Sequence, residues 1–294
     1  MLRALLQAAR PLAHGNIAPP LLYGQALAYV MTGAFSWRML VLAQVFGLVD
    51  HLFIVFANDF ADREADARNA TFNVFSGGSR VLPEGRLSPR LVLLLAIALS
   101  GILVAGTLPF ALERPLLPIL ALAAVGLMLA YSYPPLALSY RGGGEWLQAL
   151  GIGVVLPLVG FHAQEPSLAA IPWLALVPTL VLGLAGNVLT SLPDEPSDRE
   201  AGKRTWTVRR GMDRAPRDLV ALIALAIVLG AILVPFPSHL ARVVATALPL
   251  GALGTAIPMM PRGRPDRRAL LLFMIATGAA STGALVGWTI AILC

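Results

Sequence analysis

Long apolar segments alternate with short polar segments along almost the whole chain. Most apolar segments contain about twenty residues, which as a helix span a hydrocarbon core of about 30 Å. We therefore predict an all-α polytopic membrane protein that forms one domain over residues 1–294. Its expected membrane-spanning helices, about nine in number, lie at residues 17–36, 39–57, 90–112, 115–133, 146–162, 168–190, 216–236, 239–258 and 269–293.

Composition supports a lipid environment. Of the 294 residues, 57% are hydrophobic and only 13% are charged, whereas soluble domains carry about a quarter charged residues. The net charge of +6 does not indicate nucleic-acid binding, because the basic residues flank the apolar segments and no aromatic-basic recognition module is present. The single cysteine, Cys294, excludes an intramolecular disulfide.

The basic residues predict the orientation in the membrane. Of the 22 Lys and Arg residues, nineteen fall in the N-terminal segment and in the loops after the second, fourth, sixth and eighth spans. The positive-inside rule then places the N-terminus and the loops 58–89 and 191–215 on the cytoplasmic side of the cell membrane, with the C-terminus outside. Residues 1–14, with Arg3 and Arg10 between apolar positions, are expected to form an interfacial helix.

Polar and helix-breaking residues occur within the spans. Prolines such as Pro157 and Pro249 are tolerated at membrane depth where neighbouring helices or a cavity satisfy the freed carbonyls, so they indicate either an internal cavity or simple packing kinks. Asp50 and His51 lie inside the second span. They are either functional or a neutralised pair buried against another helix, and the sequence leaves both interpretations open.

An acidic motif follows the second span. If the helix continues, Asn58, Asp62 and Asp66 are spaced four residues apart and form one oxygen-rich stripe, with Asp59 beside it. Like charges four apart repel, so a bound cation would explain them, and hard oxygen ligands shared with phosphate are typical of Mg²⁺. The alternative is a solvated helix end whose acids pair with nearby arginines.

A second acidic motif follows the sixth span, with Asp194 and Asp198 again four residues apart. Four crossings separate the two motifs, so both are expected at the same end of the bundle. Lys203, the only lysine of the chain, and Arg204 follow closely enough to bind diphosphate oxygens. The alternative for Lys203 is a solvated residue that only contributes to topology.

Two other polar stretches have residues suited to an anion. The first is 77–80, Gly-Gly-Ser-Arg, where glycines let backbone N–H groups approach a phosphate beside Arg80. The second, residues 131–145, contains Tyr131, Tyr140 and Arg141. Tyr131 and Tyr140 are possible substrate contacts, whereas Tyr131 and Tyr133, at a helix end, are alternatively interfacial anchors.

These motifs resemble those of the UbiA-type intramembrane prenyltransferases. The resemblance rests on NDxxDxxxD at residues 58–66, on 76–90 and 131–145, and on the DxxxD and GKRT residues of 194–211. The runs GGSRVLPEG and AGKRTWTVRRG are most similar to the branch that prenylates 1,4-dihydroxy-2-naphthoate in menaquinone synthesis. The second motif departs from the pattern at residues 190–193, and Asn187, one turn earlier, is the candidate for the missing amide.

The resemblance implies a nine-helix bundle around a central cavity and a Mg²⁺-dependent transfer of an isoprenyl group from a prenyl diphosphate to an aromatic acceptor. The implied metal ligands are Asn58, Asp59 and the catalytic carboxylates Asp62, Asp66, Asp194 and Asp198. The expected diphosphate-binding residues are Lys203, Arg204, Arg63, Arg68, Arg80 and Arg141, and the possible substrate contacts are Asn187, Tyr131 and Tyr140.

Several alternatives remain open at this stage. The acceptor is 1,4-dihydroxy-2-naphthoate or a related quinone precursor, or else 4-hydroxybenzoate, homogentisate or a non-aromatic compound, and a terpene cyclase would use the same diphosphate site. A secondary transporter with Asp50 and His51 as ion carriers fits the hydropathy equally well, but transport sites lie near the midplane rather than at helix ends. Besides the substrates and the bilayer, no protein or nucleic-acid partner is expected.

Overall fold

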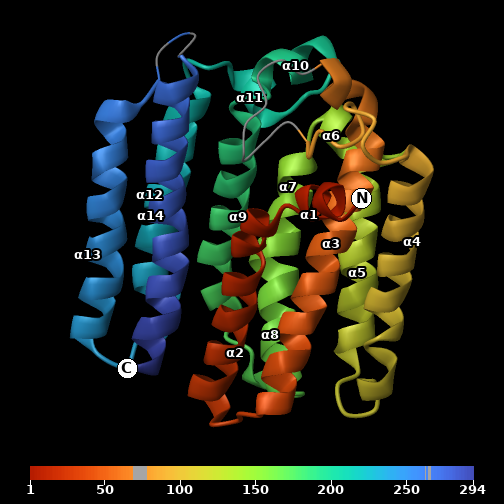
Figure 1. Ribbon diagram of the computed structural model, residues 1–294. Coiled ribbons are helices and arrows are strands. Elements are labelled where there is room, and N and C mark those ends of the chain that lie inside the picture. The colour runs from red at the N-terminus through yellow and green to blue at the C-terminus, as the bar shows by residue number, and fades with distance from the viewer. Residues whose placement is uncertain (69–77, 262, 264–265) are drawn as a thin grey trace.

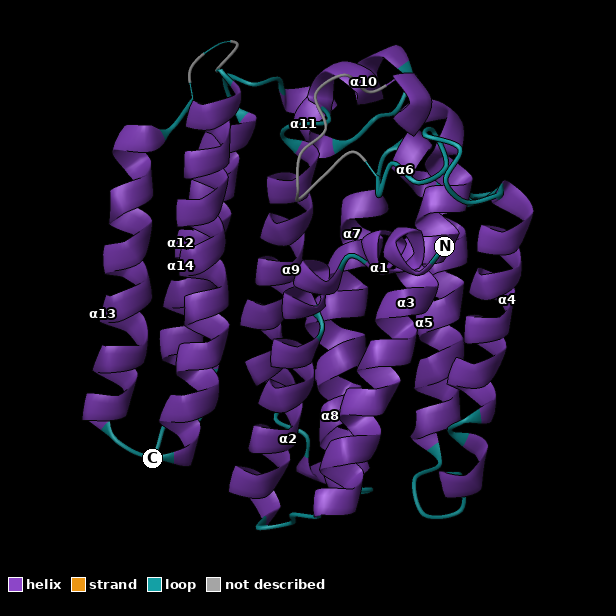
Figure 2. Cartoon of the chain, viewed as in Figure 1, coloured by secondary structure: helices purple, strands orange, loops and turns teal. Residues whose placement is uncertain are grey.

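The computed structural model describes all residues except 69–77, 262, 264 and 265, and its described part contains helices and loops but no strand (Figure 2). The long helices run side by side in one bundle (Figure 1). This architecture confirms the all-α prediction. Gly77 of the Gly-Gly-Ser-Arg stretch, and Ser76 at the start of the family motif 76–90, lie outside the described residues.

Each predicted span coincides with a helix, and the protein is a multi-pass integral membrane protein. Within the described ranges, seven helical segments are long and apolar enough to cross a bilayer: 37–68, 89–110, 144–164, 173–191, 215–233, 239–259 and 267–293. A shorter apolar helix, α5 (Leu116–Ser132), and α2 (Ala18–Thr32) occupy the two remaining predicted spans. The other helices of these spans are α3 (Trp37–Arg68), α4 (Pro89–Ala105), α7 (Gly144–Leu150), α8 (Leu156–Gln164), α9 (Leu176–Ser191), α12 (Ala215–Leu233), α13 (His239–Ala256) and α14 (Arg267–Leu293).

Helix ends follow local sequence signals. Gly33 ends α2 with a φ of 72°, a left-handed conformation that glycine adopts without strain, so the first span is shorter than predicted. Ser88, Ser238 and Asp266 each cap the N-terminus of the following helix with a side-chain oxygen. These side-chain caps and Gly33 fix the residues at which the helices begin and end.

The α-helix of the fifth span is interrupted next to Pro157, one of the prolines that lie within the spans. Between α7 and α8 the chain forms a π-helical turn, Gly151–Val155, just before Pro157. Pro157 has no N–H with which to bond the carbonyl of Gly153. The Thr179 hydroxyl of α9 donates to that carbonyl at 2.6 Å instead. A neighbouring helix thus satisfies the freed acceptor, as a hydrocarbon environment requires.

Small residues allow α2 and α8 to pack closely. A Cβ atom added at Gly160 would lie 2.1 Å from the Leu21 carbonyl oxygen, and one at Gly24 would lie 1.9 Å from that of Pro157. Contact of this kind between backbones is typical of membrane helix pairs, which gain their stability from packing rather than from the hydrophobic effect.

The two acid-rich loops lie at the same end of the bundle. Helix α3 continues past the span to Arg68, as the motif spacing required. The second acidic motif forms α10 (Glu195–Glu200), and α11 (Trp206–Arg210) and α6 (Leu138–Arg141) lie at the same end (Figure 1). The C-terminus lies at the opposite end.

The N-terminal segment is a helix, α1 (Leu2–Ala9), followed by a 3₁₀ turn, Pro11–Asn16. Ala4 and Ala8 are buried in a cluster that includes Phe53 and Phe56 of α3, whereas Leu2 and Leu6 are exposed. The location of this helix at the membrane interface stays a prediction. In addition, the segment packs against the bundle.

The close packing of α2 and α8 generates a stability prediction. Replacing Gly160 with Ala should destabilise the protein by about 1–3 kcal/mol, because the added methyl group overlaps the backbone of α2. The melting temperature of the detergent-solubilised protein measures the effect. Gly126→Ala is the control, since a Cβ there meets nothing within 4 Å. Equal melting temperatures for the two variants would contradict this packing.

Candidate active site

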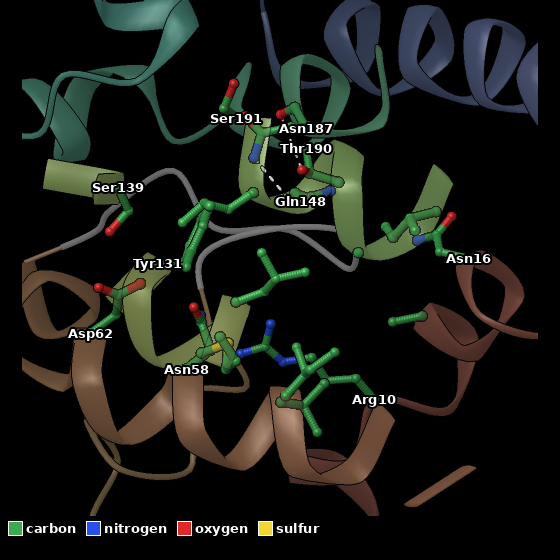
Figure 3. A pocket seen from close by; sticks show the side chains of 18 of the residues that line it. Arg10, Asn16, Asn58, Asp62, Tyr131, Ser139, Gln148, Asn187, Thr190 and Ser191 are labelled. Atoms are coloured by element: carbon green, nitrogen blue, oxygen red, sulfur yellow. Dashed lines mark hydrogen bonds between the residues drawn. The ribbon is translucent and has the colours of Figure 1, made fainter. Parts of the chain in front are cut away.

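One pocket at the loop end of the bundle contains both acidic motifs. Its walls include Asn58, Asp62 and Asp66 from α3, and Asp194 and Asp198 from the second motif. The cavity volume is about 290 Å³, near the lower limit for small-molecule sites. Figure 3 shows Asp62 and Asn58 on the same wall of the pocket, with Tyr131 beside them.

Lys203 joins the two motifs. Its Nζ lies 3.1 Å from Asp62 Oδ2 and 3.5 Å from Asp198 Oδ1, and all three side chains are at most 10% exposed. After α10, the backbone N–H of Lys203 donates a hydrogen bond to the backbone carbonyl of Asp198. This turn keeps Lys203 beside the second acidic motif. The interpretation of Lys203 as a solvated residue is therefore wrong.

Burial and charge act against each other in this ion-pair network. Burial disfavours the charged form of Lys203, but the carboxylates of Asp62 and Asp198 outweigh it and raise the pKa of the ammonium group. Burial raises the pKa of Asp198, although the Lys203 charge opposes this shift. The network therefore favours the charged form of Lys203. For Asp198, the ion pair offsets only part of the cost of burying the carboxylate.

Tyr140 extends this network. Its hydroxyl donates to Asp62 Oδ1 at 3.1 Å, and Lys203 Nζ lies 5.0 Å from the centre of its ring. Burial, together with the negative charge of Asp62, raises the pKa of Tyr140 to about 12. Tyr140 thus contacts the acidic site directly. Tyr131 lines the pocket, whereas Tyr133 donates to the Ala57 carbonyl at 2.8 Å.

A buried ion pair holds the loops around this site together. Glu145, at the start of α7, is only 2% exposed and pairs with Arg209 of α11. The Arg204 N–H also donates to the Tyr140 carbonyl at 3.1 Å. These contacts connect the stretch 138–145 to the stretch 203–211, and so position Tyr140 and Lys203 relative to each other.

Asp59 differs from the other predicted metal ligands. Its side chain forms an ion pair with Arg10 and accepts hydrogen bonds from the N–H and hydroxyl groups of Ser79. It does not line the pocket within the described part of the chain. Because Asp59 follows Asn58 directly, helical geometry turns it about 100° away from the stripe.

The five predicted diphosphate-binding arginines lie outside the pocket lining. The guanidinium carbon of Arg63 lies 4.6 Å from the centre of the Phe60 ring, and the Arg80 guanidinium donates a hydrogen bond to the Asp66 carbonyl. Arg68, Arg141 and Arg204 are exposed. Of the described basic side chains, Lys203 and Arg10 line the cavity.

The pocket also contains polar residues that the motifs did not indicate. Those outside the quoted motifs include Arg10, Asn16, Asp50, His51 and Gln148, and Ser139 and Thr205 lie within motifs but were not predicted as site residues. Gln148 accepts a hydrogen bond from Asn187 at 2.7 Å, so the predicted contact Asn187 lies at the cavity wall (Figure 3). The sequence contained one signal for these additional residues, namely the two ionisable residues Asp50 and His51 within the second span.

The donor set of the pocket fits a hard divalent cation that shares its coordination with a ligand. Among the described residues no three His, Cys, Asp or Glu side chains are close enough to form a complete metal cage. Mg²⁺ needs only one or two carboxylates when phosphate oxygens and water complete its octahedron. The Lys203 ammonium already occupies a cation position between Asp62 and Asp198. The carboxylates are therefore suited to bind positive charge at this point.

Comparison with known proteins identifies relatives over most of the chain. The sequence profile of the UbiA prenyltransferase family matches residues 17–274. Lycopene elongase/hydratase of Corynebacterium glutamicum is 30% identical over 239 residues, which cover 78% of this chain and 76% of that protein. The 4-hydroxybenzoate octaprenyltransferase of Aromatoleum aromaticum is 29% identical over 174 residues, covering 55% of each protein.

Experimental structures with similar folds agree with this match. A UbiA homolog from Archaeoglobus fulgidus, bound to GPP and Mg²⁺, superposes with a TM-score of 0.68 at 19% identity and covers 99% of this chain and 100% of its own. The apo structure of a UbiA homolog from Aeropyrum pernix gives a TM-score of 0.65 at 20% identity, covering 91% and 96%. At these identities the likeness shows the fold.

The Glu145–Arg209 pair generates a second prediction. Replacing Arg209 with Met leaves Glu145 buried without its cation, which should destabilise the protein by about 1–3 kcal/mol after allowance for the exposed arginine. The melting temperature measures the loss. The control Arg210→Met removes the neighbouring, more exposed pair with Asp218 and should stay close to the wild type. A smaller decrease in melting temperature for Arg209→Met than for Arg210→Met would contradict the stabilising role of the Glu145–Arg209 pair.

Proposed function

This chain belongs to the UbiA prenyltransferase family, and from that premise we propose that it transfers a prenyl group from a prenyl diphosphate to an acceptor bound in the same pocket. The observation that carries the proposal is the bridge of Lys203 between Asp62 and Asp198. It brings two carboxylate motifs and a buried cation to one cavity at the boundary between loops and membrane helices.

We propose that Asp62, Asp66, Asp194 and Asp198, with the Asn58 amide, bind Mg²⁺ and the diphosphate jointly. When bound, Mg²⁺ neutralises the diphosphate and makes it a better leaving group. Asp59 takes no direct part in this proposal, because Arg10 and Ser79 already hold its carboxylate.

The chain's own residues contribute binding and electrostatic stabilisation. In this proposal Lys203 binds a diphosphate oxygen in exchange for one of its carboxylates; in support, Lys203 lines the pocket, and the Ser139 hydroxyl there is buried without a partner among the described residues. The Tyr131 ring, which also lines the pocket, stabilises positive charge on the allylic carbon as the bond to the diphosphate breaks. Apolar side chains such as Met128 and Ile152 limit the access of water to that carbon.

The acceptor is proposed to be aromatic, with 1,4-dihydroxy-2-naphthoate as the first candidate. The runs at residues 77–85 and 201–211 support this branch. The names of the relatives include both a 4-hydroxybenzoate octaprenyltransferase and a lycopene elongase/hydratase. The cavity of about 290 Å³ accommodates the reacting groups, so a long prenyl tail would continue between the helices.

The proposed location is the cell membrane, with the active-site loops on the cytoplasmic side. There the diphosphate group of the prenyl donor can stay in contact with water. The distribution of basic residues supports this orientation. The alternative of a secondary transporter is set aside, because the family to which the chain belongs consists of enzymes of the prenyltransferase type.

The two acidic motifs generate the first functional prediction. Asp62→Asn and Asp198→Asn should each lower turnover by at least about 10²-fold, because each removes charge from the diphosphate site. Purified protein given several prenyl diphosphates and 1,4-dihydroxy-2-naphthoate, 4-hydroxybenzoate or homogentisate is assayed for products by mass spectrometry. Glu64→Gln is the control, since the Glu64 side chain is 75% exposed on the same helix. Wild-type turnover in both aspartate variants would refute the site.

Removal of the metal is an independent test. Treatment with EDTA should abolish prenyl transfer, and excess Mg²⁺ should restore it, because the leaving diphosphate carries more negative charge than Lys203 alone neutralises. The assay is product formation before and after the addition of Mg²⁺. Undiminished transfer in EDTA would rule out a metal-dependent mechanism.

A further inference from the structure

The loop that carries Lys203 runs directly into the short helix α11, which lies at the loop end of α9 (Figure 1). Thr205 caps the N-terminus of α11, because its side-chain oxygen accepts a hydrogen bond from the Val208 N–H at 3.4 Å. Helix α11 has only five residues, and a helix of this length is not stable by itself. The position of Lys203 therefore depends on the contacts that hold α11 in place.

Thr207 forms a buried contact between α11 and α9. It is 0% exposed, and its Oγ1 atom lies 2.6 Å from Ser191 Oγ. The Ser191 hydroxyl has a single proton, which it donates to the Val188 carbonyl at 3.0 Å. Thr207 is therefore the donor, and Ser191 the acceptor, of the hydrogen bond between the two helices.

Ser191 connects this hydrogen bond to the pocket. It is the last residue of α9 and lines the cavity. In Figure 3, its hydroxyl points away from the other labelled side chains. The Ser191 side chain is thus shared between the wall of the pocket and the helix that follows Lys203.

Two further polar contacts hold α11, and each includes a more exposed partner. Trp206 Nε1 donates to Asp218 Oδ2 of α12 at 2.9 Å, and both side chains are only partly buried. Arg209 pairs with Glu145 of α7, but the arginine side chain is 47% exposed. Both partners of the Thr207–Ser191 bond are buried, so water does not compete for it, and a hydrogen bond is stronger in such a place.

We propose that Thr207 is a positioning residue for Lys203: its hydrogen bond to Ser191 fixes α11 against α9, and this keeps the ammonium group in the pocket. Lys203 carries a point charge on a flexible four-carbon side chain. The backbone of its loop must therefore be held at both ends. The bond from the Lys203 N–H to the Asp198 carbonyl holds the α10 end, and Thr207 holds the α11 end. The consequence for catalysis rests on the proposed function, in which Lys203 binds the diphosphate.

The test uses the fact that Lys203 is the only lysine of the chain. The full-length protein in detergent, without Mg²⁺ or substrates, is treated with N-acetoxysuccinimide at one fixed pH. Acetylation of Lys203 is followed by mass spectrometry, with a lysine-containing peptide as internal standard. In the wild type the reaction should be slow, because the side chain is 10% exposed and ion-paired.

Thr207→Val replaces the hydroxyl with a methyl group of similar size. It should increase the acetylation rate of Lys203 by about 3–10-fold, the effect expected when local opening of the loop loses the opposition of one hydrogen bond. Thr207→Ser keeps the donor and should retain the slow rate. In a Ser191→Ala background, Thr207→Val should cause no further increase, because the bond is already absent.

Thr277→Val is the matched control for the loss of a buried threonine hydroxyl. Thr277 is also 0% exposed, but its hydroxyl donates to the Phe273 carbonyl at 2.8 Å within α14. This variant should leave the acetylation rate of Lys203 at the wild-type value. The comparison separates positioning of Lys203 from a general loss of stability.

An unchanged rate in Thr207→Val, an equal increase in Thr277→Val, or a fast rate in Thr207→Ser would each refute the positioning role. If Thr207→Val does not fold, Ser191→Ala removes the same hydrogen bond from the other side and decides by the same criterion. Absence of prenyl transfer by the wild type with Mg²⁺ and donor, together with the expected labelling pattern, would refute the proposed function alone.

Discussion

The active-site end of this protein depends on the ion-pair network of Lys203 with Asp62 and Asp198. Two carboxylates buried at the edge of a membrane bundle repel each other and lose hydration, and a cation between them offsets both costs. Lys203 supplies that cation from a loop more than 130 residues after Asp62 in the sequence. The network thereby holds two distant parts of the chain around one cavity.

The same principle recurs around the pocket. Arg10 of the N-terminal segment pairs with the buried Asp59, and Arg209 of α11 pairs with the buried Glu145. In each pair the acid lies on a helix of the bundle, and the base comes from a short peripheral segment. Ion pairs therefore help to attach the loops and the N-terminal segment to the bundle, whereas the helices are attached to one another through packing, as at Gly160 and Leu21.

Helix α3 organises the chemistry along its length. Its stripe changes from a carboxylate at Asp50, through apolar Ile54, to the amide of Asn58 and the carboxylates Asp62 and Asp66. One face of a single helix thus carries the carboxylates of the proposed diphosphate site and an apolar wall that continues into the bundle.

The sequence by itself determined the helical class, the positions of the spans and the acidic stripe of α3, because hydrophobic length and the helical period are local properties. It also predicted that both acidic motifs share one end of the bundle, since an even number of crossings separates them. Only the tertiary structure decided which charges meet. It turned Asp59 toward Arg10, left Arg141 and Arg204 at the surface, and brought Arg10 and Asp50 into the cavity. These outcomes depend on contacts between residues far apart in the chain, and charge pairing over such separations is set by how the helices pack rather than by any local pattern.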